Sequence, residues 1–331
     1  MLMRLKELQS FLKGKNIGFS LISSEDANFK YFNGFNDLMG CLVISKNDAF
    51  IVSSPLDINA AKSNSRIKKI YPVKRTLTSA IKIKSKTIGI NKDNITLNRY
   101  KQFKKCFKKA KFIDISNILS ELRSKKTNEE ISRIKYACRI VDKILFRLAK
   151  ELSRTKSEIG IASFIKKEIK KYNCEEAFPT IVASGKNSSH IHHIPTKTKL
   201  NGFTIIDIGV KYRDYCSDVS RTFYIGTPSK RDIVDYSRVF NIINNIKTTK
   251  DINKIKLLKN QVHSLGHSIG LEVHEKPTII QKTKLSNGMV VAIEPASYYK
   301  SYGIRIEDTF LIKNNKLINL NKFPRNLIIR H

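Results

Sequence analysis

Histidine is the residue type whose distribution first indicates chemistry in this sequence. No histidine precedes residue 190, and six of the seven lie between residues 190 and 274. An imidazole can ligate a metal ion or transfer a proton near neutral pH, although a single histidine is more often only a hydrogen-bonding residue. His267 lies among glycines, with His263 four residues before it and His274 seven residues after it. These positions become candidates for a site because acidic residues accompany them.

Two pairs of acidic residues lie in apolar segments of the same region. Asp207 follows Phe-Thr-Ile-Ile, and Asp218 comes eleven residues later. A hairpin that turns at residues 212–213 would place these two carboxylates opposite each other. Glu294 and Glu307 flank a second turn in the same way. Like charges opposed across strands are destabilising unless something positive lies between them.

Divalent cations explain the four acids economically. The apolar residues before Asp207 and Glu294 predict buried strands, where an unpaired carboxylate carries a large free-energy cost. Two divalent cations would neutralise four carboxylates and leave a bridging hydroxide as the nucleophile. The alternative interpretation is that each acid pairs with one of the 62 lysine and arginine side chains.

The set resembles the five-ligand signature of the pita-bread metallopeptidases, peptidase family M24. The similarity is greatest to the Xaa-Pro dipeptidase (prolidase) and aminopeptidase P branch, whose catalytic domain follows a creatinase-type N-terminal domain. It is specific over residues 178–309 and loose over residues 1–125. The resemblance implies that one metal ion is chelated by Asp207 and the other by His267 with Glu294. It also implies that Asp218 and Glu307 bridge both ions.

Four further residues match positions of the same family. The resemblance implies that His192 contacts the substrate, that His263 and His274 support the ligands and handle protons, and that Arg305 lies near the bridging glutamate. The residues themselves agree in part, because Arg305 and Glu307 are two apart in a predicted strand and so share a face. The imidazoles of His192 and His274 could stabilise an oxyanion or pass a proton to the leaving nitrogen.

The implied activity is hydrolysis of the peptide bond that precedes proline, through a metal-bridging hydroxide. Four oxygen-donating residues and one nitrogen donor favour Mn²⁺ or Co²⁺, and Zn²⁺ or Fe²⁺ stay open. The substrate would be a peptide with proline after the scissile bond, and the resemblance implies a homodimer. Dipeptidase and longer-peptide aminopeptidase activity are not separated by these residues. Non-prolyl or creatinase-like hydrolysis on the same fold stays an alternative.

Two features depart from the family pattern. Ser268 stands where a glycine usually follows the metal histidine. The segment between Gly226 and His263 is shorter than usual by about fifteen residues, which is three to four helical turns. We expect one helix there to be truncated or absent, without effect on the ligands.

The elements that must position these residues divide the chain into residues 1–124 and residues 125–331. In the first part, strand-like and helical segments alternate, which predicts a small α/β domain with a mixed sheet. It contains no histidine and no glycine-rich phosphate loop. The expected strands are 17–22, 41–45, 49–53, 67–71, 87–90 and 111–115, and the expected helices are 3–12, 56–63 and 97–109.

The second part begins with two predicted helices, each opened by a Ser/Thr-x-x-Glu capping box. Thr127 with Glu130 opens the first helix, and Thr155 with Glu158 opens the second. Strands follow after residue 178, with one more helix near 231–246. The resemblance implies that this part is a pita-bread catalytic domain, an α+β fold with a curved antiparallel sheet.

Composition limits the remaining possibilities. The chain has 331 residues and a formal net charge of +34, but its lysines are spread along the whole sequence. We therefore expect no nucleic-acid partner, and a non-catalytic scaffold that binds a polyanion or a protein stays the alternative. The five cysteines are scattered and odd in number, which favours reduced thiols in a cytoplasm. No apolar run is long enough for a membrane helix.

Overall fold

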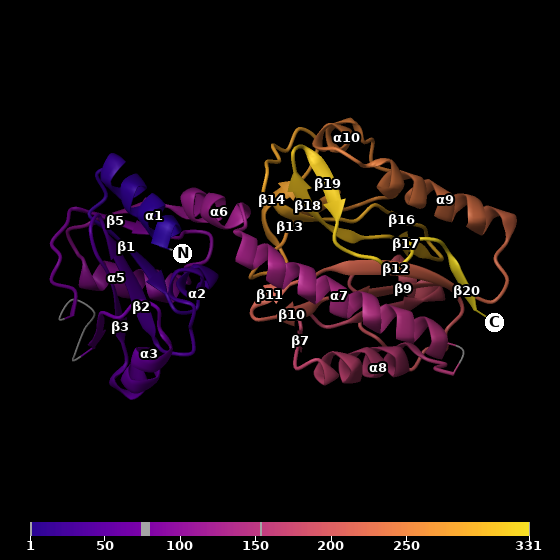
Figure 1. Ribbon diagram of the computed structural model, residues 1–331, viewed down its shortest axis with the longest axis horizontal. Coiled ribbons are helices and arrows are strands. Elements are labelled where there is room, and N and C mark those ends of the chain that lie inside the picture. The colour runs from indigo at the N-terminus through magenta and orange to yellow at the C-terminus, as the bar shows by residue number, and fades with distance from the viewer. Residues whose placement is uncertain (1, 74–79, 153, 331) are drawn as a thin grey trace. The chain divides into compact units, whose positions relative to one another are not determined.

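A six-stranded mixed sheet forms the centre of the N-terminal unit, which ends at Arg123 (Figure 1). This computed structural model describes residues 2–73, 80–152 and 154–330. Strands β1, β2 and β3 pair antiparallel, and the outer pairs are parallel. In sheet order the strands are β4 (Ile70–Pro72), β3 (Ala49–Ser53), β2 (Gly40–Ser45), β1 (Phe19–Ser23), β5 (Thr87–Ile90) and β6 (Lys111–Asp114).

Helices cover both faces of this sheet because its side chains alternate between two apolar cores. Ile22 and Leu42 belong to the core on one face, whereas Leu21 and Val43 belong to the core on the other. The second core also receives Phe103 from a helix that follows β5. The helices that contribute to the first core are α1 (Leu2–Gly14), α2 (Ala27–Asn33), α3 (Ile58–Asn64) and α6 (Ser116–Ser124), and α5 (Leu97–Cys106) contributes to the second.

The six predicted strands and three predicted helices of this unit are confirmed, with shifted ends. The expected helix 56–63 is divided between a 3₁₀ turn, η1 (Pro55–Asp57), and α3. Helices α2 and α6 were not predicted. Asp26 caps α2 by accepting a hydrogen bond from the Asn28 backbone N–H, and Gly34 ends it in a left-handed conformation. These caps stabilise a helix of only seven residues, which is too short for a clear apolar period.

The second unit begins at Ser124 with two helices, α7 (Asn128–Glu151) and α8 (Glu158–Lys171). The capping box of Thr127 and Glu130 is confirmed. The predicted box of Thr155 and Glu158 is wrong, because Ser157 caps α8 and the Glu158 carboxylate bonds to another segment. Both helices pack in one core with strands of a four-stranded sheet. That sheet contains β20 (Ile328–Arg330), β12 (Val219–Ile225), β9 (Gly202–Ile208) and β8 (Ile181–Ser184).

A five-stranded antiparallel sheet supplies the other half of this unit. Two short ribbons accompany the larger sheets: β16 (Ala296–Tyr298) with β17 (Gly303–Arg305), and β7 (Glu175–Glu176) with β10 (Val210–Tyr212) and β11 (Tyr215–Cys216). The five strands are β14 (Glu275–Ile279), β13 (Gly266–Ser268), β15 (Val290–Ile293), β18 (Asp308–Lys313) and β19 (Lys316–Asn319).

The predicted helix near 231–246 is present as α9 (Lys230–Asn245), which shares a core with strands of the five-stranded sheet. A helix of six residues, α10 (Thr249–Lys254), follows it. These two helices lie in the segment between Gly226 and His263, where the sequence analysis expects a truncated or absent helix. In the part of the chain that the structure describes, no helix has the length and apolar character to cross a membrane.

Candidate active site

The first acidic hairpin carries Asp207 on β9. Strands β9 and β12 pair antiparallel, and Asp207 lies opposite Ser220. The predicted opposition of Asp207 and Asp218 is therefore wrong. The turn falls at Arg213 and Asp214, which both adopt left-handed backbone angles of the kind found in tight hairpin turns, and its centre lies one residue beyond the expected centre. Asp218 precedes the first residue of β12 and still reaches the same cavity as Asp207.

The second acidic hairpin agrees with the sequence prediction. Ile293 pairs with Asp308 on one side of a break in the ladder, and Ala296 pairs with Arg305 on the other side. The same register extended through the break places Glu294 opposite Glu307. Pro295 lies in this break, and its carbonyl accepts a hydrogen bond from Ile306 N–H at 3.2 Å.

His267 lies on β13, which pairs with β15 so that His267 is opposite Ala292. The approach of these strands requires glycine at position 266, since a Cβ atom there would lie 2.0 Å from the Ala292 carbonyl oxygen. His267 Nε2 is 3.6 Å from Asp218 Oδ2 and 3.9 Å from Glu294 Oε1. The strand thus brings one imidazole to both acidic hairpins.

Three overlapping groups of these side chains have ligand atoms within 4.8 Å of one another. Each group could hold a metal ion. The groups are Asp207 with Asp218 and Glu307, His267 with Glu294 and Glu307, and Asp218 with His267 and His274.

Two buried oxygens at this centre show that the residues fit divalent cations. Asp207 Oδ1 and Asp218 Oδ1 are buried without a hydrogen-bond partner. Such orphaned carboxylate oxygens are costly in a protein interior. The hard oxygen donors and the single imidazole form a suitable ligand set for such ions.

The acids also shift one another's proton affinity. Burial raises the pKa of Asp218 well above its ordinary value, and the negative charges of Glu307 and Asp207 raise it further. Burial likewise raises the pKa of Glu307, together with the charges of Glu294 and Asp207. Burial raises the pKa of Glu294 to about 7. Bound cations would favour the ionised carboxylates and so reverse these shifts.

Arg305 provides the positive charge inside this cluster. Its Nη2 donates to Asp207 Oδ2 at 2.7 Å, and its Nε donates to Ser220 Oγ at 2.9 Å. Ser220 Oγ in turn donates to Glu307 Oε2 at 3.0 Å. The expected orientation of Glu307 by the guanidinium is therefore indirect, and Asp207 is the carboxylate that Arg305 contacts.

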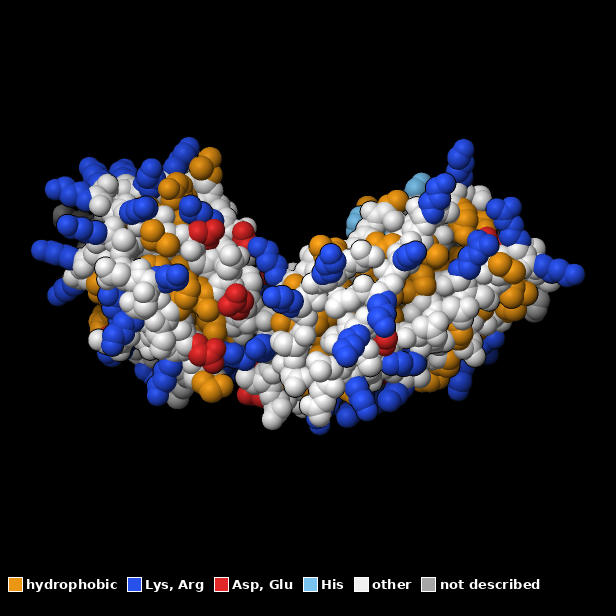
Figure 2. Space-filling view, turned by 90° about the horizontal axis from the view of Figure 1, so that it is seen from above, with side chains coloured by type: hydrophobic (Ala, Val, Ile, Leu, Met, Phe, Trp, Pro, Cys, Tyr) orange, Lys and Arg blue, Asp and Glu red, His pale blue; other side chains and the backbone are white. Residues whose placement is uncertain are grey.

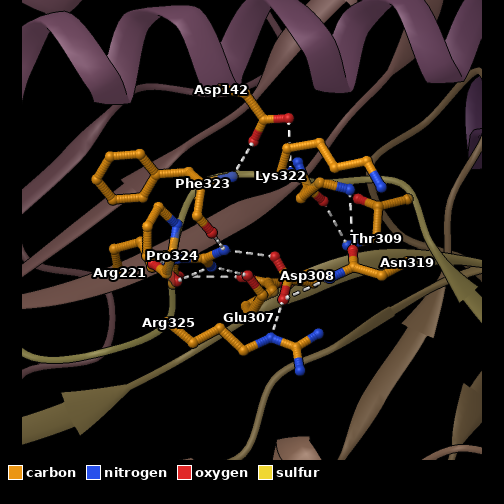
Figure 3. A network of polar contacts seen from close by, with 12 residues as sticks. Asp142, Arg221, Glu307, Asp308, Thr309, Asn319, Lys322, Phe323, Pro324 and Arg325 are labelled. Carbon is orange, nitrogen blue, oxygen red and sulfur yellow. Dashed lines mark hydrogen bonds and ion pairs between the residues drawn. The ribbon is translucent and has the colours of Figure 1, made fainter.

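A network of buried charges holds the backbone next to Glu307 (Figure 3). Arg221 Nη1 donates to the Glu307 carbonyl at 2.6 Å, and Arg221 Nη2 donates to Asp308 Oδ1 at 2.6 Å. Arg325 also donates to Asp308. The carbonyls of Phe323 and Pro324 accept further hydrogen bonds from Arg221. This network fixes the backbone at the start of β18, directly after Glu307, whose side chain lines the cavity.

The cavity that contains these acids has a volume of about 330 Å³. His192 and His274 line it. His263 does not line it. The His263 ring lies behind Glu294, with Nδ1 3.7 Å from Glu294 Oε2 and Nε2 3.1 Å from the Tyr298 hydroxyl. The ring centroids of His267 and His274 are 4.4 Å apart.

Three residues of the site region were missed by the sequence analysis. Tyr298 joins His263 to Arg305, whose Nη1 donates to the Tyr298 hydroxyl at 2.8 Å. Ser220 joins Arg305 to Glu307. Glu158 contacts His193, which lines the cavity beside His192. Their sequence offers no motif, because a tyrosine, a serine and a helix-starting glutamate are common and only tertiary pairing gives them partners.

Two family models match this chain. The model described as "Metallopeptidase family M24" matches residues 132–314. The model described as "Creatinase/Prolidase N-terminal domain" matches residues 4–125.

The relatives cover nearly the full length of the chain. A protein of Pyrococcus furiosus named "Xaa-Pro dipeptidase" is 31% identical over 347 residues, with 98% of this chain and 99% of that protein covered. The prolidase structure from Pyrococcus horikoshii OT3 is similar with a TM-score of 0.89 and 29% identity, covering 98% of this chain and 100% of that one. The X-Pro aminopeptidase structure from Thermotoga maritima MSB8 is similar with a TM-score of 0.81 and 27% identity, covering 95% of this chain and 98% of that one.

Proposed function

Because this chain belongs to metallopeptidase family M24, we propose that it hydrolyses the peptide bond preceding proline with two divalent cations. The fold, a mixed α/β domain followed by a pita-bread domain, confirms the class predicted from the sequence. The observation that carries the proposal is the convergence of five ligand-type side chains in one cavity of about 330 Å³. The relatives named for Xaa-Pro substrates support the choice of bond.

The ligands would be divided as the resemblance implies. Asp207 would hold one ion, His267 and Glu294 the other, and Asp218 and Glu307 both. The three overlapping groups within 4.8 Å support this division. Bound in this way, the cations would supply an activated water as nucleophile and would polarise the scissile carbonyl. The oxygen-rich ligand set favours Mn²⁺ or Co²⁺.

The chain's own residues would bind the substrate and handle charge around it. His192 and His274 line the cavity, so their imidazoles can donate a hydrogen bond to a developing oxyanion or give a proton to the leaving nitrogen. Apolar side chains of the same cavity, among them Phe178, Ile191 and Val273, offer a surface on which a proline ring can pack. These contacts would favour substrates with proline after the scissile bond.

Arg305 and His263 would act on the ligands. Arg305 restrains Asp207 through the 2.7 Å contact, which leaves the other carboxylate oxygen, Oδ1, directed to a cation. His263 lies 3.7 Å from Glu294 and restrains the second acidic hairpin. Outer contacts of this kind orient ligands and tune their basicity.

Metal removal and restoration test the proposal. The protein is stripped with EDTA, assayed with Ala-Pro, Ala-Pro-Ala and Ala-Ala, and assayed again after addition of Mn²⁺, Co²⁺ or Zn²⁺. We expect no hydrolysis without metal and hydrolysis of a proline-containing substrate with it. Cleavage of Ala-Pro alone would identify a dipeptidase, and cleavage of Ala-Pro-Ala an aminopeptidase. Absence of hydrolysis with every metal would favour the non-catalytic scaffold. Preferred hydrolysis of Ala-Ala would contradict the specificity for proline.

The partners and location proposed from the sequence need separate measurements. We propose a homodimer, which sedimentation of the full chain would test, and a cytoplasmic location with reduced thiols. The five cysteines are free in the structure. Lysine and arginine side chains are spread over both units in the view of Figure 2. This distribution supports the expectation that the net charge serves no dedicated polyanion site.

A further inference from the structure

A buried glutamate outside the ligand set contacts the segment that bears His192. Glu158 is the first residue of α8, and its side chain has no exposed surface. Its carboxylate points away from the helix and bonds to residues between Ser184 and Thr196. This segment includes cavity-lining residues from Ile191 to Pro195.

Both carboxylate oxygens of Glu158 are saturated by this segment. Oε1 accepts hydrogen bonds from the Ser184 backbone N–H at 2.8 Å and from Asn187 Nδ2 at 2.9 Å. Oε2 accepts from Thr196 N–H at 3.0 Å and from the Thr196 hydroxyl at 2.8 Å, and it lies 2.8 Å from His193 Nε2. Five contacts therefore join one helix terminus to both ends and the middle of the segment.

These contacts compensate for the lack of regular structure in the segment. After the 3₁₀ turn η2 (Gly185–Ser189), residues 190–196 form neither helix nor strand. Although burial acts to raise the pKa of Glu158, hydrogen bonds from Asn187, His193 and the backbone lower it below the ordinary value. The carboxylate therefore stays ionised, and hydrogen bonds to an ionised acceptor are the stronger kind.

We propose that Glu158 is a positioning residue that holds the His192-bearing wall of the cavity, residues 185–196, in its substrate-binding conformation. Glu158 does not touch the cavity, and it acts through His193, Thr196 and Asn187. This inference rests on the proposed function, because it assigns the wall to binding of the proline-containing substrate.

A matched pair of variants in α8 tests the inference. Glu158→Gln keeps the size of the side chain but removes the charge and replaces an acceptor oxygen by an NH₂ group. Glu168→Gln is the control, because Glu168 is also buried in α8 but pairs with Arg147 and Lys171. Both variants lose a buried ionised acceptor, and only the first loses contacts to the cavity wall.

Activity and hydrogen exchange are measured on the full chain with metal. We expect Glu158→Gln to lower kcat/KM for the preferred Xaa-Pro substrate by about 10- to 100-fold. Metal content should match the unmodified protein, because the ligands lie on other elements. Amide exchange in residues 185–196 should accelerate by about tenfold or more, while exchange in β12 should not change. Glu168→Gln should keep kcat/KM and the exchange of the wall.

The outcomes separate this inference from the proposed function. No hydrolysis by the unmodified protein with any metal would overturn the proposed function. An active unmodified protein with unchanged activity and unchanged wall exchange in Glu158→Gln would overturn the positioning role alone. Equal losses in both variants would also overturn it, because the effect would then be general destabilisation. If Glu158→Gln does not fold, Thr196→Val removes one hydroxyl donor and should shift both measurements in the same direction by a smaller factor.

Discussion

Asp218 and Glu307 illustrate how single residues at this centre depend on ions. Both side chains are buried, and burial with neighbouring carboxylates raises the pKa of each. Without cations the folded protein therefore binds protons that the unfolded chain would release. The residues that define the centre are thus a source of instability in the metal-free protein.

A pH dependence of stability follows from these shifts. From about pH 7.5, one unit above the ordinary histidine value, the lowered pKa values of His263, His267 and His274 contribute little slope, because these rings are then mostly neutral in both states. The pKa of Glu294 is about 7 against an ordinary 4.5, so the folded state holds its proton longer than the unfolded state. Stability should then fall as the pH rises above about 7.5, by at most about 1.4 kcal/mol per group and pH unit.

Thermal unfolding of the EDTA-stripped protein measures this effect. The midpoint should fall as the pH rises from about 7.5 to about 8.5, and Glu294→Gln should reduce the fall because it removes one raised group. Saturating Mn²⁺ should abolish or reverse it, since the ions bind ionised carboxylates. A midpoint that rises with pH in the metal-free protein would contradict the assignment of these shifts.

A second prediction concerns His267, the only imidazole in the proposed set of five ligands. His267→Ala removes the imidazole whose Nε2 lies 3.6 Å from Asp218 Oδ2 and 3.9 Å from Glu294 Oε1. We expect the metal content to fall from two ions per chain to one and hydrolysis of the Xaa-Pro substrate to be lost, while the circular dichroism spectrum is retained. Lys150→Ala is a control, because Lys150 lies at an exposed position of α7, away from the cavity. Full activity of His267→Ala would contradict the ligand assignment.

The residue types of the centre were accessible from the sequence because their order is a family pattern. The five ligand-type residues were located without coordinates, and all five lie together. Tyr298, Ser220 and Glu158 were not accessible. Their partners are distant in sequence, and a hydroxyl or carboxylate that finds its partner only after folding leaves no local pattern.

At the scale of elements, the two acidic hairpins show when register can be predicted. The Glu294–Glu307 hairpin has equal arms around one turn, so counting from the turn gives the correct opposition. The Asp207 hairpin contains the additional ribbon of β10 and β11, which turns at Arg213 and Asp214. A shift of one residue in the turn centre replaces Asp218 by Ser220 as the partner of Asp207.

The loop that carries His274 depends on a buried ion pair. Lys126 Nζ donates to Ser268 Oγ at 3.1 Å and to Glu275 Oε2 at 3.2 Å, and both charged side chains are almost fully buried. Ser268 follows His267, and Glu275 follows His274. Glu275 Oε1 also accepts a hydrogen bond from Leu271 N–H. The serine that departs from the family pattern is thus satisfied by a lysine from the start of the unit.

Removal of the Lys126 side chain should lower the free energy of unfolding. Lys126→Met leaves the Glu275 carboxylate buried beside an apolar side chain, which typically costs about 3–5 kcal/mol. We expect a clear fall in the thermal midpoint, with part of the loss recovered in the double variant Lys126→Met, Glu275→Gln. Lys150→Met, at an exposed position of α7, serves as the control and should have little effect. A small effect of Lys126→Met would show that the pair does not stabilise the loop.

At the scale of the whole molecule, the ligand-type residues all lie in one of two compact units. Metal binding should therefore stabilise the unit from Ser124 onward. A ligand at about 100 times its Kd adds about 2.7 kcal/mol to the state that binds it. In calorimetry of the full chain, we expect Mn²⁺ to move the transition of this unit and to leave that of the N-terminal unit in place. A shift of both transitions together would indicate that the units unfold as one.

The contacts of Arg221 with the Phe323 and Pro324 carbonyls, and of Arg325 with Asp308, have a consequence for the order in which the protein is synthesised. The backbone beside Glu307 is fixed by carbonyl groups and by an arginine that follow the four acids and the imidazole of the centre in the sequence. The order of the acidic cluster therefore depends on residues that are synthesised after all of its own members.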